Sequence, residues 1–303
     1  MHFLQSPAWE AFQQSLGKTT FRRSGEGWEY LAILENGGGL KRLYCPYGPT
    51  VTSERSLRSA LESLKALAQS QKCAYVRVEP LGTEVEKLAR KFNLFKIPYS
   101  QPTHTWCIDL TQTRDEIIAQ MKQNNRNIYR NYQNKGLSYR QSTNPKDIEY
   151  LITLLKGVAS HNQITVHSDE YFRQQAQQFL PSGDGLLHLI EHKKKVIAAA
   201  LTYQDNTTVY YAHAAADHEH RKLNASTALL AEIIMQAKDS SREVCDLFGI
   251  TTSEDSTHRW AGFTKFKKSF GGYEKVLSET YDLPVKKMAY QVYRSARFIA
   301  RYL

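Results

Sequence analysis

Three lysines in one short segment are the first residues of this sequence that could take part in chemistry. Lys265, Lys267 and Lys268 crowd into four consecutive positions. Such cations suit a phosphate-bearing partner or a negative charge that develops during a reaction. The alternative is a plain basic strand edge, on which alternation would put Lys265 and Lys267 together on one solvated face.

Two other basic stripes follow a helical spacing. Lys122, Arg126 and Arg130 recur every four residues, so they would lie along one helix face and could follow the phosphates of an RNA helix. A solvated helix face is the commoner explanation of such spacing. The second stripe, near the end of the chain, consists of Arg294, Arg297 and Arg301 beside Tyr290, Tyr293 and Phe298. Its composition suits contact with a membrane surface, and core packing of the aromatics is the alternative.

The sequence lacks the residue patterns of several other kinds of chemical site. The four cysteines lie far apart without a C-x-x-C pair, which argues against a zinc site and a disulfide scaffold and favours reduced, buried thiols. No Ser-His-Asp spacing or nucleophile elbow is present, so a covalent mechanism has no support. These cysteines are Cys45, Cys73, Cys107 and Cys245.

Composition places the chain among soluble globular proteins. It has 303 residues, 41% of them hydrophobic, and a formal net charge of +10. That length favours about two domains. No run of about 18 apolar residues and no basic-then-apolar N-terminal segment occurs, so we expect neither a membrane span nor a signal peptide and place the protein in the cytoplasm.

Hydrophobic periodicity predicts two successive α/β units. In the first, a helix over 7–16 precedes a hairpin of 28–34 with 40–44, a long helix around Leu57–Leu67, a strand over 74–78 and a helix over 83–92. We therefore predict an α/β (α+β) fold with mixed sheets flanked by helices, divided into domains 1–104 plus 279–303 and 105–278.

The second unit begins with a strand over 106–110. Thr113 and Glu116 form a capping-box signature for one helix with Ile117, Met121, Ile128 and Tyr132 on its apolar face. The later predicted elements are a strand over 137–141, helices over 147–159 and 169–179, strands over 186–190, 196–203 and 208–213, a helix over 225–237, a strand over 244–248 and a terminal helix over 284–303.

Six motifs in order give the chain a resemblance to the Fem-type (FemXAB) aminoacyltransferases. They are Gln5-Ser6 with Trp9, Tyr44 to Pro49, Val78-Glu79-Pro80, Ile108-Asp109-Leu110, the helix end from Arg126 to Gly136, and Gly262 to Gly272. The resemblance implies two tandem acetyltransferase-like (GNAT) domains. The helix over 225–237 is too short for the coiled-coil arm of some members, so the compact, arm-less type is expected.

The resemblance also implies an activity. It predicts transfer of an amino acid from aminoacyl-tRNA to a stem-peptide amine of a peptidoglycan precursor, in cell-wall synthesis. The co-substrate is aminoacyl-tRNA, and no further cofactor or metal is expected. An acyl-CoA-dependent N-acyltransferase and a non-catalytic tRNA- or envelope-binding module are the alternatives. Against the former, the stretch His220 to Ser226 lacks the glycine that would let a backbone turn approach a pyrophosphate.

Candidate catalytic residues follow from the matched motifs. Phe266-Lys267 resembles a Phe-Lys pair at the family's reaction centre, so Lys267 is the expected cation. Glu79 matches an acidic position near the cleft and could orient the acceptor amine, act as base, or be a turn carboxylate. Lys265 and Lys268 join Lys122, Arg126 and Arg130 as candidate tRNA-binding residues.

Candidate substrate-binding residues depart from the family pattern. His167 holds the position of a diphosphate-binding arginine, and a neutral imidazole is the poorer phosphate clamp. Tyr171 matches a family tyrosine, and the other candidates are Tyr47, Tyr211 and His213, with Tyr211 and His213 expected on one strand face. A family phosphate lysine is also missing after Trp9. We therefore expect a lipid-linked precursor more than a UDP-linked one, a monomeric protein, and a peripheral contact with the inner face of the membrane.

Overall fold

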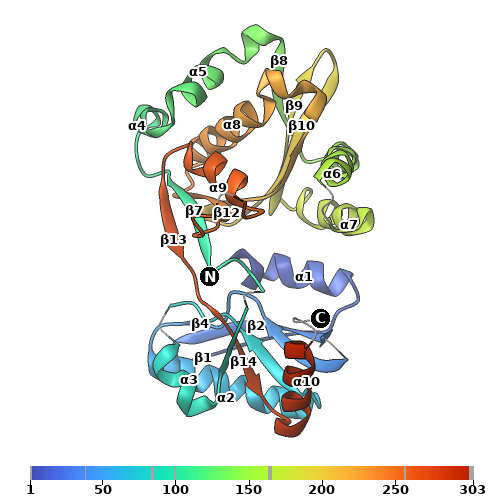
Figure 1. Ribbon diagram of the computed structural model, residues 1–303, viewed down its shortest axis with the longest axis vertical. Helices are drawn as coiled ribbons and strands as arrows, with labels where there is room; N and C mark the ends of the chain where they lie inside the picture. Colours follow the sequence, from blue (N-terminus) through green and yellow to red (C-terminus); the bar gives the residue numbers. More distant parts are fainter. Residues whose placement is uncertain are drawn as a thin grey trace. The chain divides into compact units, whose positions relative to one another are not determined.

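The computed structural model describes residues 2–37, 39–82, 85–98, 100–162, 166–255 and 257–299. The chain divides into two compact units, Met1–Thr103 with Leu277–Leu303, and His104–Val276. The predicted domains have nearly the same bounds. Each unit contains its own seven-stranded sheet with helices on its faces, as Figure 1 shows.

The first unit is built around a mixed sheet in the order β1-β2-β3-β5-β14-β6, with β4 paired to β2. Strands β3 and β5 are parallel, and the predicted hairpin is the antiparallel pair β2 and β3. The elements in chain order are η1 (Phe3–Gln5), α1 (Pro7–Ser15), β1 (Thr20–Gly25), β2 (Trp28–Gly37), β3 (Leu40–Cys45), β4 (Thr50–Val51), α2 (Glu54–Ser70), β5 (Tyr75–Val78), α3 (Glu86–Phe92), β6 (Phe95–Ile97), β14 (Thr280–Pro284) and α10 (Lys287–Ile299).

Alternation along β5 assigns its two faces to different helices. Val76 and Val78 belong to the core cluster that the leucines of α2 form, whereas Tyr75 packs against Tyr290 of α10. Successive strand residues point to opposite faces, so α2 and α10 cover opposite sides of β5. Each buried leucine of α2 contributes about 2 kcal/mol through the apolar surface removed from water.

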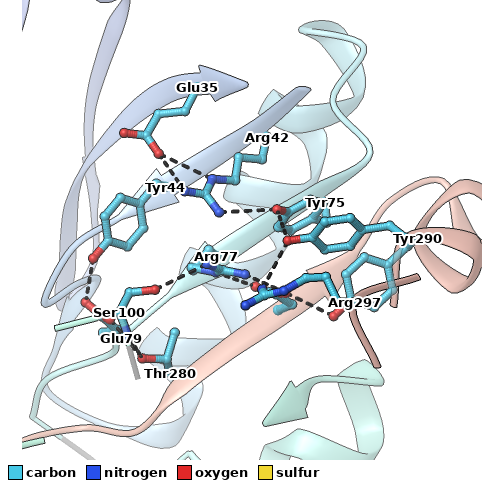
Figure 2. A network of polar contacts seen from close by, with 12 residues as sticks. Glu35, Arg42, Tyr44, Tyr75, Arg77, Glu79, Ser100, Thr280, Tyr290 and Arg297 are labelled. Atoms are coloured by element: carbon cyan, nitrogen blue, oxygen red, sulfur yellow. Dashed lines mark hydrogen bonds and ion pairs between the residues drawn. The ribbon is translucent and has the colours of Figure 1, made fainter. Parts of the chain in front are cut away.

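A buried polar network fixes β14 and α10 to the first unit (Figure 2). Arg77 donates to Asp282 from Nε (2.8 Å) and from its second terminal nitrogen (3.1 Å), and the Tyr290 hydroxyl donates to the same carboxylate at 3.0 Å. Both charged side chains are buried, so the bidentate geometry is needed to offset the cost of removing them from water. The C-terminal helix is thereby docked on the first unit.

The second unit has a mixed sheet in the order β13-β7-β12-β11-β10-β9-β8. Strands β11 and β12 are parallel. The elements in chain order are β7 (His104–Asp109), α4 (Arg114–Gln120), α5 (Gln123–Asn131), η2 (Gln133–Lys135), β8 (Leu137–Ser142), η3 (Pro145–Asp147), α6 (Ile148–Asn162), α7 (Asp169–Phe179), β9 (Gly185–His192), β10 (Lys195–Gln204), β11 (Thr208–Ala216), η4 (His218–Leu223), α8 (Ala225–Asp239), β12 (Val244–Gly249), α9 (Ala261–Lys268) and β13 (Tyr273–Val276).

Helices cover both faces of this sheet. The mostly apolar helix α8 packs with α4 and α5 in one core cluster on one face, and α6 and α7 lie on the other, as Figure 1 shows. The helix predicted from Thr113 onward is in fact two helices. Met121 adopts an extended conformation (ψ 145°), which ends α4 before α5 begins. Its capping box is present, because Thr113 and Glu116 bond to each other's backbone N–H groups.

Short elements were the ones that periodicity did not predict. Strands β1, β6 and β13 have few residues or lack clear alternation, and α9 was expected as a possible strand edge. The predicted terminal helix continues to residue 303, but residues 300–303, which include Arg301, lie outside the described part of the chain. Among the described residues, no helix is both long and apolar enough to cross a bilayer.

Candidate functional site

Strands β11 and β12 of the second unit separate partway along their lengths. Their parallel pairing covers Thr208–Tyr210 opposite Val244–Asp246, whereas β11 continues to Ala216 and β12 to Gly249. Where two neighbouring strands diverge, backbone groups lose their ladder partners and can bind side chains or ligands. The diverging ends are therefore the first place to look for a site.

Helix α9 brings Lys267 to the end of β12. Its Nζ donates a 2.7 Å hydrogen bond to the carbonyl oxygen of Gly249. Burial lowers the pKa of Lys267 to about 8, although the negative charge of Asp246 acts in the opposite direction. An ammonium with this pKa remains mostly protonated at neutral pH, and in a half-buried place its charge acts strongly on nearby atoms.

An irregular strand end positions the Gly249 carbonyl. Pairing of β12 with β7 shifts register between Asp246 and Gly249, and Phe248 has φ 62°, a left-handed conformation uncommon for a bulky residue. Asp246 is buried, and its Oδ1 accepts from the Phe248 N–H at 2.8 Å. Burial raises the pKa of Asp246. The carboxylate thus holds the kinked backbone that receives Lys267.

Helical geometry in α9 separates lysines that a strand would have put together. The expectation of a strand edge with Lys265 and Lys267 on one solvated face is wrong, because residues 261–268 are helical. Lys267 lies one turn after Phe263, on the face directed to β12, and Phe263 is 53% exposed. Lys265 and Lys268 lie on another face of the helix.

A hollow of about 330 Å³ adjoins that second face of α9. None of its three lysines forms an ion pair within the described part of the chain, and Lys268 lies 5.0 Å from the centre of the Trp106 ring. Two acids also line the hollow, so it is not uniformly basic. The lining residues are Lys122, Thr251, Ser253, Glu254, Asp255, Ala261, Thr264, Lys265 and Lys268.

The break between α4 and α5 brings Lys122 to this hollow. Its backbone N–H donates to the Ser269 carbonyl at 2.9 Å, just after α9. Arg126 instead donates to the carbonyls of Ala119 (2.9 Å) and Met121 (2.6 Å), which ends α4 with a guanidinium cap. The predicted stripe of Lys122, Arg126 and Arg130 on one continuous helix face is therefore wrong, since Lys122 precedes the helix. Arg130 is exposed on α5.

An aromatic group joins α7 to β10 and β11. The His167 ring stacks on Tyr171 at 4.3 Å, and Phe172 meets the edge of His213 at 5.0 Å. Tyr203 Oη and His213 Nε2 are 3.1 Å apart. Ser168 caps α7 by accepting from the Tyr171 N–H, which fixes where the helix begins. The structure thus brings together three predicted residues: His167, Tyr171 and His213.

Both histidines of the aromatic group are neutral at pH 7. Burial lowers the pKa of His167, and burial together with the neighbouring His167 lowers the pKa of His213 to about 3. Flat uncharged rings suit the apolar face of a sugar, a base or a peptide. They are poor partners for a diphosphate, which favours guanidinium or ammonium groups.

A β-bulge separates Tyr211 from His213. The register between β10 and β11 passes from Leu201 opposite His213 to Thr202 opposite Tyr211, so Ala212 is the extra residue. One inserted residue reverses the alternation. Tyr211 consequently packs against the core cluster of α8, while His213 contacts Phe172. The prediction that Tyr211 and His213 share one strand face is wrong.

Two candidates of the first unit are inside its core. Glu79 is fully buried and accepts four hydrogen bonds, from the backbone of Tyr47 and Gln101 and from the hydroxyls of Tyr44 and Thr280. Burial raises its pKa, and the four donors oppose the rise. Tyr47 is also fully buried, so the expectation that it contacts substrate is wrong. Glu79 is a carboxylate that positions loops, with no lone pair directed to solvent.

One group of side chains has the spacing of a metal site. Ligand atoms of Asp217, Glu219 and His220 lie within 4.8 Å of one another. Asp217 already accepts from Lys195 at 2.9 Å and contacts His220 at 3.0 Å, which satisfies its carboxylate without an ion.

Sequence reasoning did not select Asp246, Gly249 or Phe263. A charged residue within the apolar run Val244–Phe248 was an available signal, because acids are rarely buried without a role. The carbonyl of Gly249 carried no signal, since any residue has one. Phe263 was quoted within a motif, but its exposure could not be read from the sequence.

Comparison with known proteins finds a match to one protein family in part of the chain. Residues 186–297 match the sequence model of the FemAB family. This matching stretch, the FemAB segment, covers just over a third of the chain. The predicted resemblance to the Fem-type family is confirmed, and the segment includes His213, the kinked end of β12 and all of α9. No curated protein sequence matches the chain.

Solved structures support the predicted fold around the FemAB segment. A crystal structure of FemX is similar with a TM-score of 0.85 at 16% identity, covering 96% of this chain and 94% of that one. L-PGS from Bacillus licheniformis has a TM-score of 0.60 at 13% identity, covering 98% of this chain and 97% of that one. A tandem GNAT protein from the clavulanic acid biosynthesis pathway has a TM-score of 0.54 at 12% identity, covering 94% of this chain and 90% of that one. The expected tandem GNAT-like architecture is confirmed.

Proposed function

We propose that this protein is an aminoacyltransferase that moves an amino acid from aminoacyl-tRNA to a stem-peptide amine of a peptidoglycan precursor. The observation that carries the proposal is Lys267 in the FemAB segment. It is a half-buried cation, 2.7 Å from the Gly249 carbonyl, at the end of a strand that diverges from its neighbour. Such a cation suits a reaction in which negative charge develops on oxygen.

The donor side of the proposal is supported by the surface around α9. Lys122, Lys265 and Lys268 line one hollow without ion-pair partners among the described residues, so their charges are free to meet phosphates. Phe263, on the face that carries Lys267, offers an exposed ring on which an unpaired base can stack. Phosphate contacts and a stacking surface on one helix suit the single-stranded 3′ end of a tRNA.

The acceptor side is supported by the aromatic group on α7 and β11. His167, Tyr171 and His213 give stacking surfaces without a positive charge. A soluble nucleotide-linked precursor would bring a diphosphate that needs cations, and this group supplies none. We therefore assign the aromatic group to the sugar or peptide part of the precursor and favour a lipid-linked form.

The reaction is an aminolysis of an ester. The acceptor nitrogen attacks the ester carbonyl, a C–N bond forms, and the carbonyl oxygen becomes negative in a tetrahedral intermediate. The bond to the ribose oxygen then breaks, and the proton lost by the amine ends on that oxygen, which leaves as a hydroxyl. Lys267 stabilises the negative oxygen or the leaving ribose oxygen. Glu79 is not assigned as base, because four donors already occupy its oxygens.

A mass measurement tests the proposal. The purified protein is incubated with a pool of charged tRNAs and, in separate arms, a lipid-linked and a UDP-linked precursor. We expect the stem peptide of the lipid-linked arm to gain the mass of an amino-acid residue. An acetyl-CoA arm without tRNA tests the alternative donor.

Controls make the result specific. The stem peptide should gain no mass when the tRNA is uncharged. It should also gain none when the charged tRNA is treated with RNase before mixing. Increments that depend on acetyl-CoA, or none with either precursor at micromolar protein, would overturn the proposal. An increment in the UDP-linked arm alone would keep the activity and refute the assignment of a lipid-linked acceptor.

A further inference from the structure

Helix α10 presents an apolar stripe to solvent. Met288 is 77% exposed and Val292 is 69% exposed, and these are the two most exposed large apolar side chains in the described part of the chain. Their spacing of four residues puts them one turn apart on the same helix face. Two adjacent, largely exposed apolar side chains form a small apolar patch on this face of the helix.

The opposite face of α10 is firmly attached to the first unit. Tyr290 is buried and donates to Asp282, and the Tyr293 ring stacks on Tyr75 at 5.3 Å. Arg294 lies 4.5 Å from the centre of the Phe95 ring. Because this face is fixed by packing, the exposed stripe is not a frayed helix end that would turn inward to bury itself.

The charges around the stripe have one sign. Lys286 and Lys287 are exposed immediately before Met288, and no acidic residue follows Asp282 in the sequence. The usual neutralising acids one turn away are therefore absent from α10. A helix whose exposed apolar residues directly follow two exposed lysines, with no acid nearby in the sequence, suits the surface of an anionic bilayer.

We propose that the outer face of α10 docks on an anionic phospholipid surface, with Met288 and Val292 entering the headgroup boundary and Lys286 and Lys287 contacting lipid phosphates. The charge decides between occupants. A second copy of this chain would place like-charged helices together, which is unfavourable. RNA would satisfy the cations and leave the apolar stripe in water. An anionic membrane satisfies both.

The inference goes beyond the proposed transfer reaction, and its test needs neither tRNA nor precursor. Purified full-length protein is mixed with sucrose-loaded vesicles of phosphatidylcholine, with and without 30% phosphatidylglycerol. The bound fraction is measured by sedimentation over a range of lipid and salt concentrations. We expect binding to the anionic vesicles that weakens as salt rises, and little binding to phosphatidylcholine alone.

Two double variants separate the apolar and ionic contributions. Lys286→Gln with Lys287→Gln should weaken binding about twentyfold, since each lysine near an anionic surface contributes about fivefold. Met288→Gln with Val292→Gln should weaken it about tenfold by removing the apolar contacts. All four positions are exposed, so neither variant should lower the melting temperature.

Matched controls lie elsewhere on the surface. Val276→Gln changes a valine of equal exposure (68%) on β13, and Lys65→Gln with Lys135→Gln removes the same two charges. Neither should change binding by more than about twofold. The proposal is overturned if anionic vesicles do not bind, if both α10 variants bind like the parent, or if the controls lose binding equally. A dimer in sedimentation velocity that Met288→Gln with Val292→Gln dissociates would also overturn it.

Discussion

Two cations of this protein, the buried Arg77 and the half-buried Lys267, are held in opposite ways. In the first unit, Arg77 meets a carboxylate: burial by itself would lower its pKa, but the hydrogen bonds and charge of Asp282 outweigh burial and hold the pKa above its ordinary value. In the second unit, Lys267 meets the uncharged Gly249 carbonyl, and burial lowers its pKa to about 8. A neutralised cation stabilises a fold, whereas a cation held by a neutral acceptor keeps its charge for a ligand.

The surroundings of the two cations extend the contrast. Arg77, Asp282 and Tyr290 form a closed network in which donors and acceptors match (Figure 2). Around α9, Lys265 and Lys268 have no ion-pair partner within the described residues. The first arrangement is complete without a ligand. The second gains favourable contacts when an anion arrives, which is the property expected of a binding surface.

The largest expected effect comes from breaking the closed network. Asp282→Ala leaves Arg77 buried without its carboxylate, so we expect the free energy of unfolding to fall by about 3–5 kcal/mol. Urea unfolding followed by circular dichroism measures the change. Glu279→Ala removes the partner of exposed Lys96 and should cost at most about 1 kcal/mol. Equal losses in the two variants would mean that the network does not support the fold as described.

The next effect comes from the open surface. Replacing Lys122, Lys265 and Lys268 together by Gln should raise the Kd for tRNA about twentyfold at 100 mM salt and reduce the salt slope by about three. Fluorescence anisotropy with labelled tRNA gives both quantities. Stability should change little, since all three side chains are exposed.

A control variant has the same net charge as the variant in which Lys122, Lys265 and Lys268 are replaced. Lys65, Lys91 and Lys135, each exposed, are replaced by Gln, and tRNA should bind it nearly as it binds the parent. If both triple variants lose the same affinity, the tRNA is attracted by overall charge and the hollow has no special role.

The smallest effect is a dependence on pH. Lys267 has a pKa of about 8 in the folded protein, so its ammonium is mostly present below pH 8 and is lost as pH rises through that value. The protonated fraction falls from about one half to about one tenth between pH 8 and 9, so the single-turnover transfer rate should fall about fivefold, after spontaneous ester hydrolysis is subtracted. Lys267→Arg stays charged and should lack this decline. A decline of equal size in that variant would assign it to another group.

Much of the fold could be predicted because it follows from hydrophobic periodicity. The leucines of α2 and the capping box at Thr113 had clear local patterns, and α4 and α7 start where expected. The prediction of one continuous helix through Met121 failed for a tertiary reason. The apolar spacing continues across the break, but the backbone leaves the helix there, and the N–H of Lys122 bonds to Ser269 instead. Hydrophobic periodicity does not reveal a single residue in an extended conformation.

The candidate site was predicted in part. Lys267 and the His167–Tyr171 pair came from motifs, and the structure gives them neighbours that motifs do not encode. The bulge at Ala212 separates Tyr211 from His213, and the φ of Phe248 exposes the Gly249 carbonyl. Both are backbone irregularities, and a residue-by-residue reading of alternation assumes that none occurs. The sequence left three roles open for Glu79, and its four donors, which come from segments distant in sequence, favour the structural role.

One measurement tests the central claim that the unneutralised lysine of the second unit carries the chemistry. Enzyme saturated with labelled aminoacyl-tRNA is mixed with lipid-linked precursor, and label on the stem peptide is followed in a single turnover for the parent, Lys267→Arg and Lys267→Ala. We expect Lys267→Ala to transfer about 10²–10³-fold more slowly at unchanged melting temperature, with Lys267→Arg between the two. Equal transfer rates in the parent and Lys267→Ala would contradict the claim.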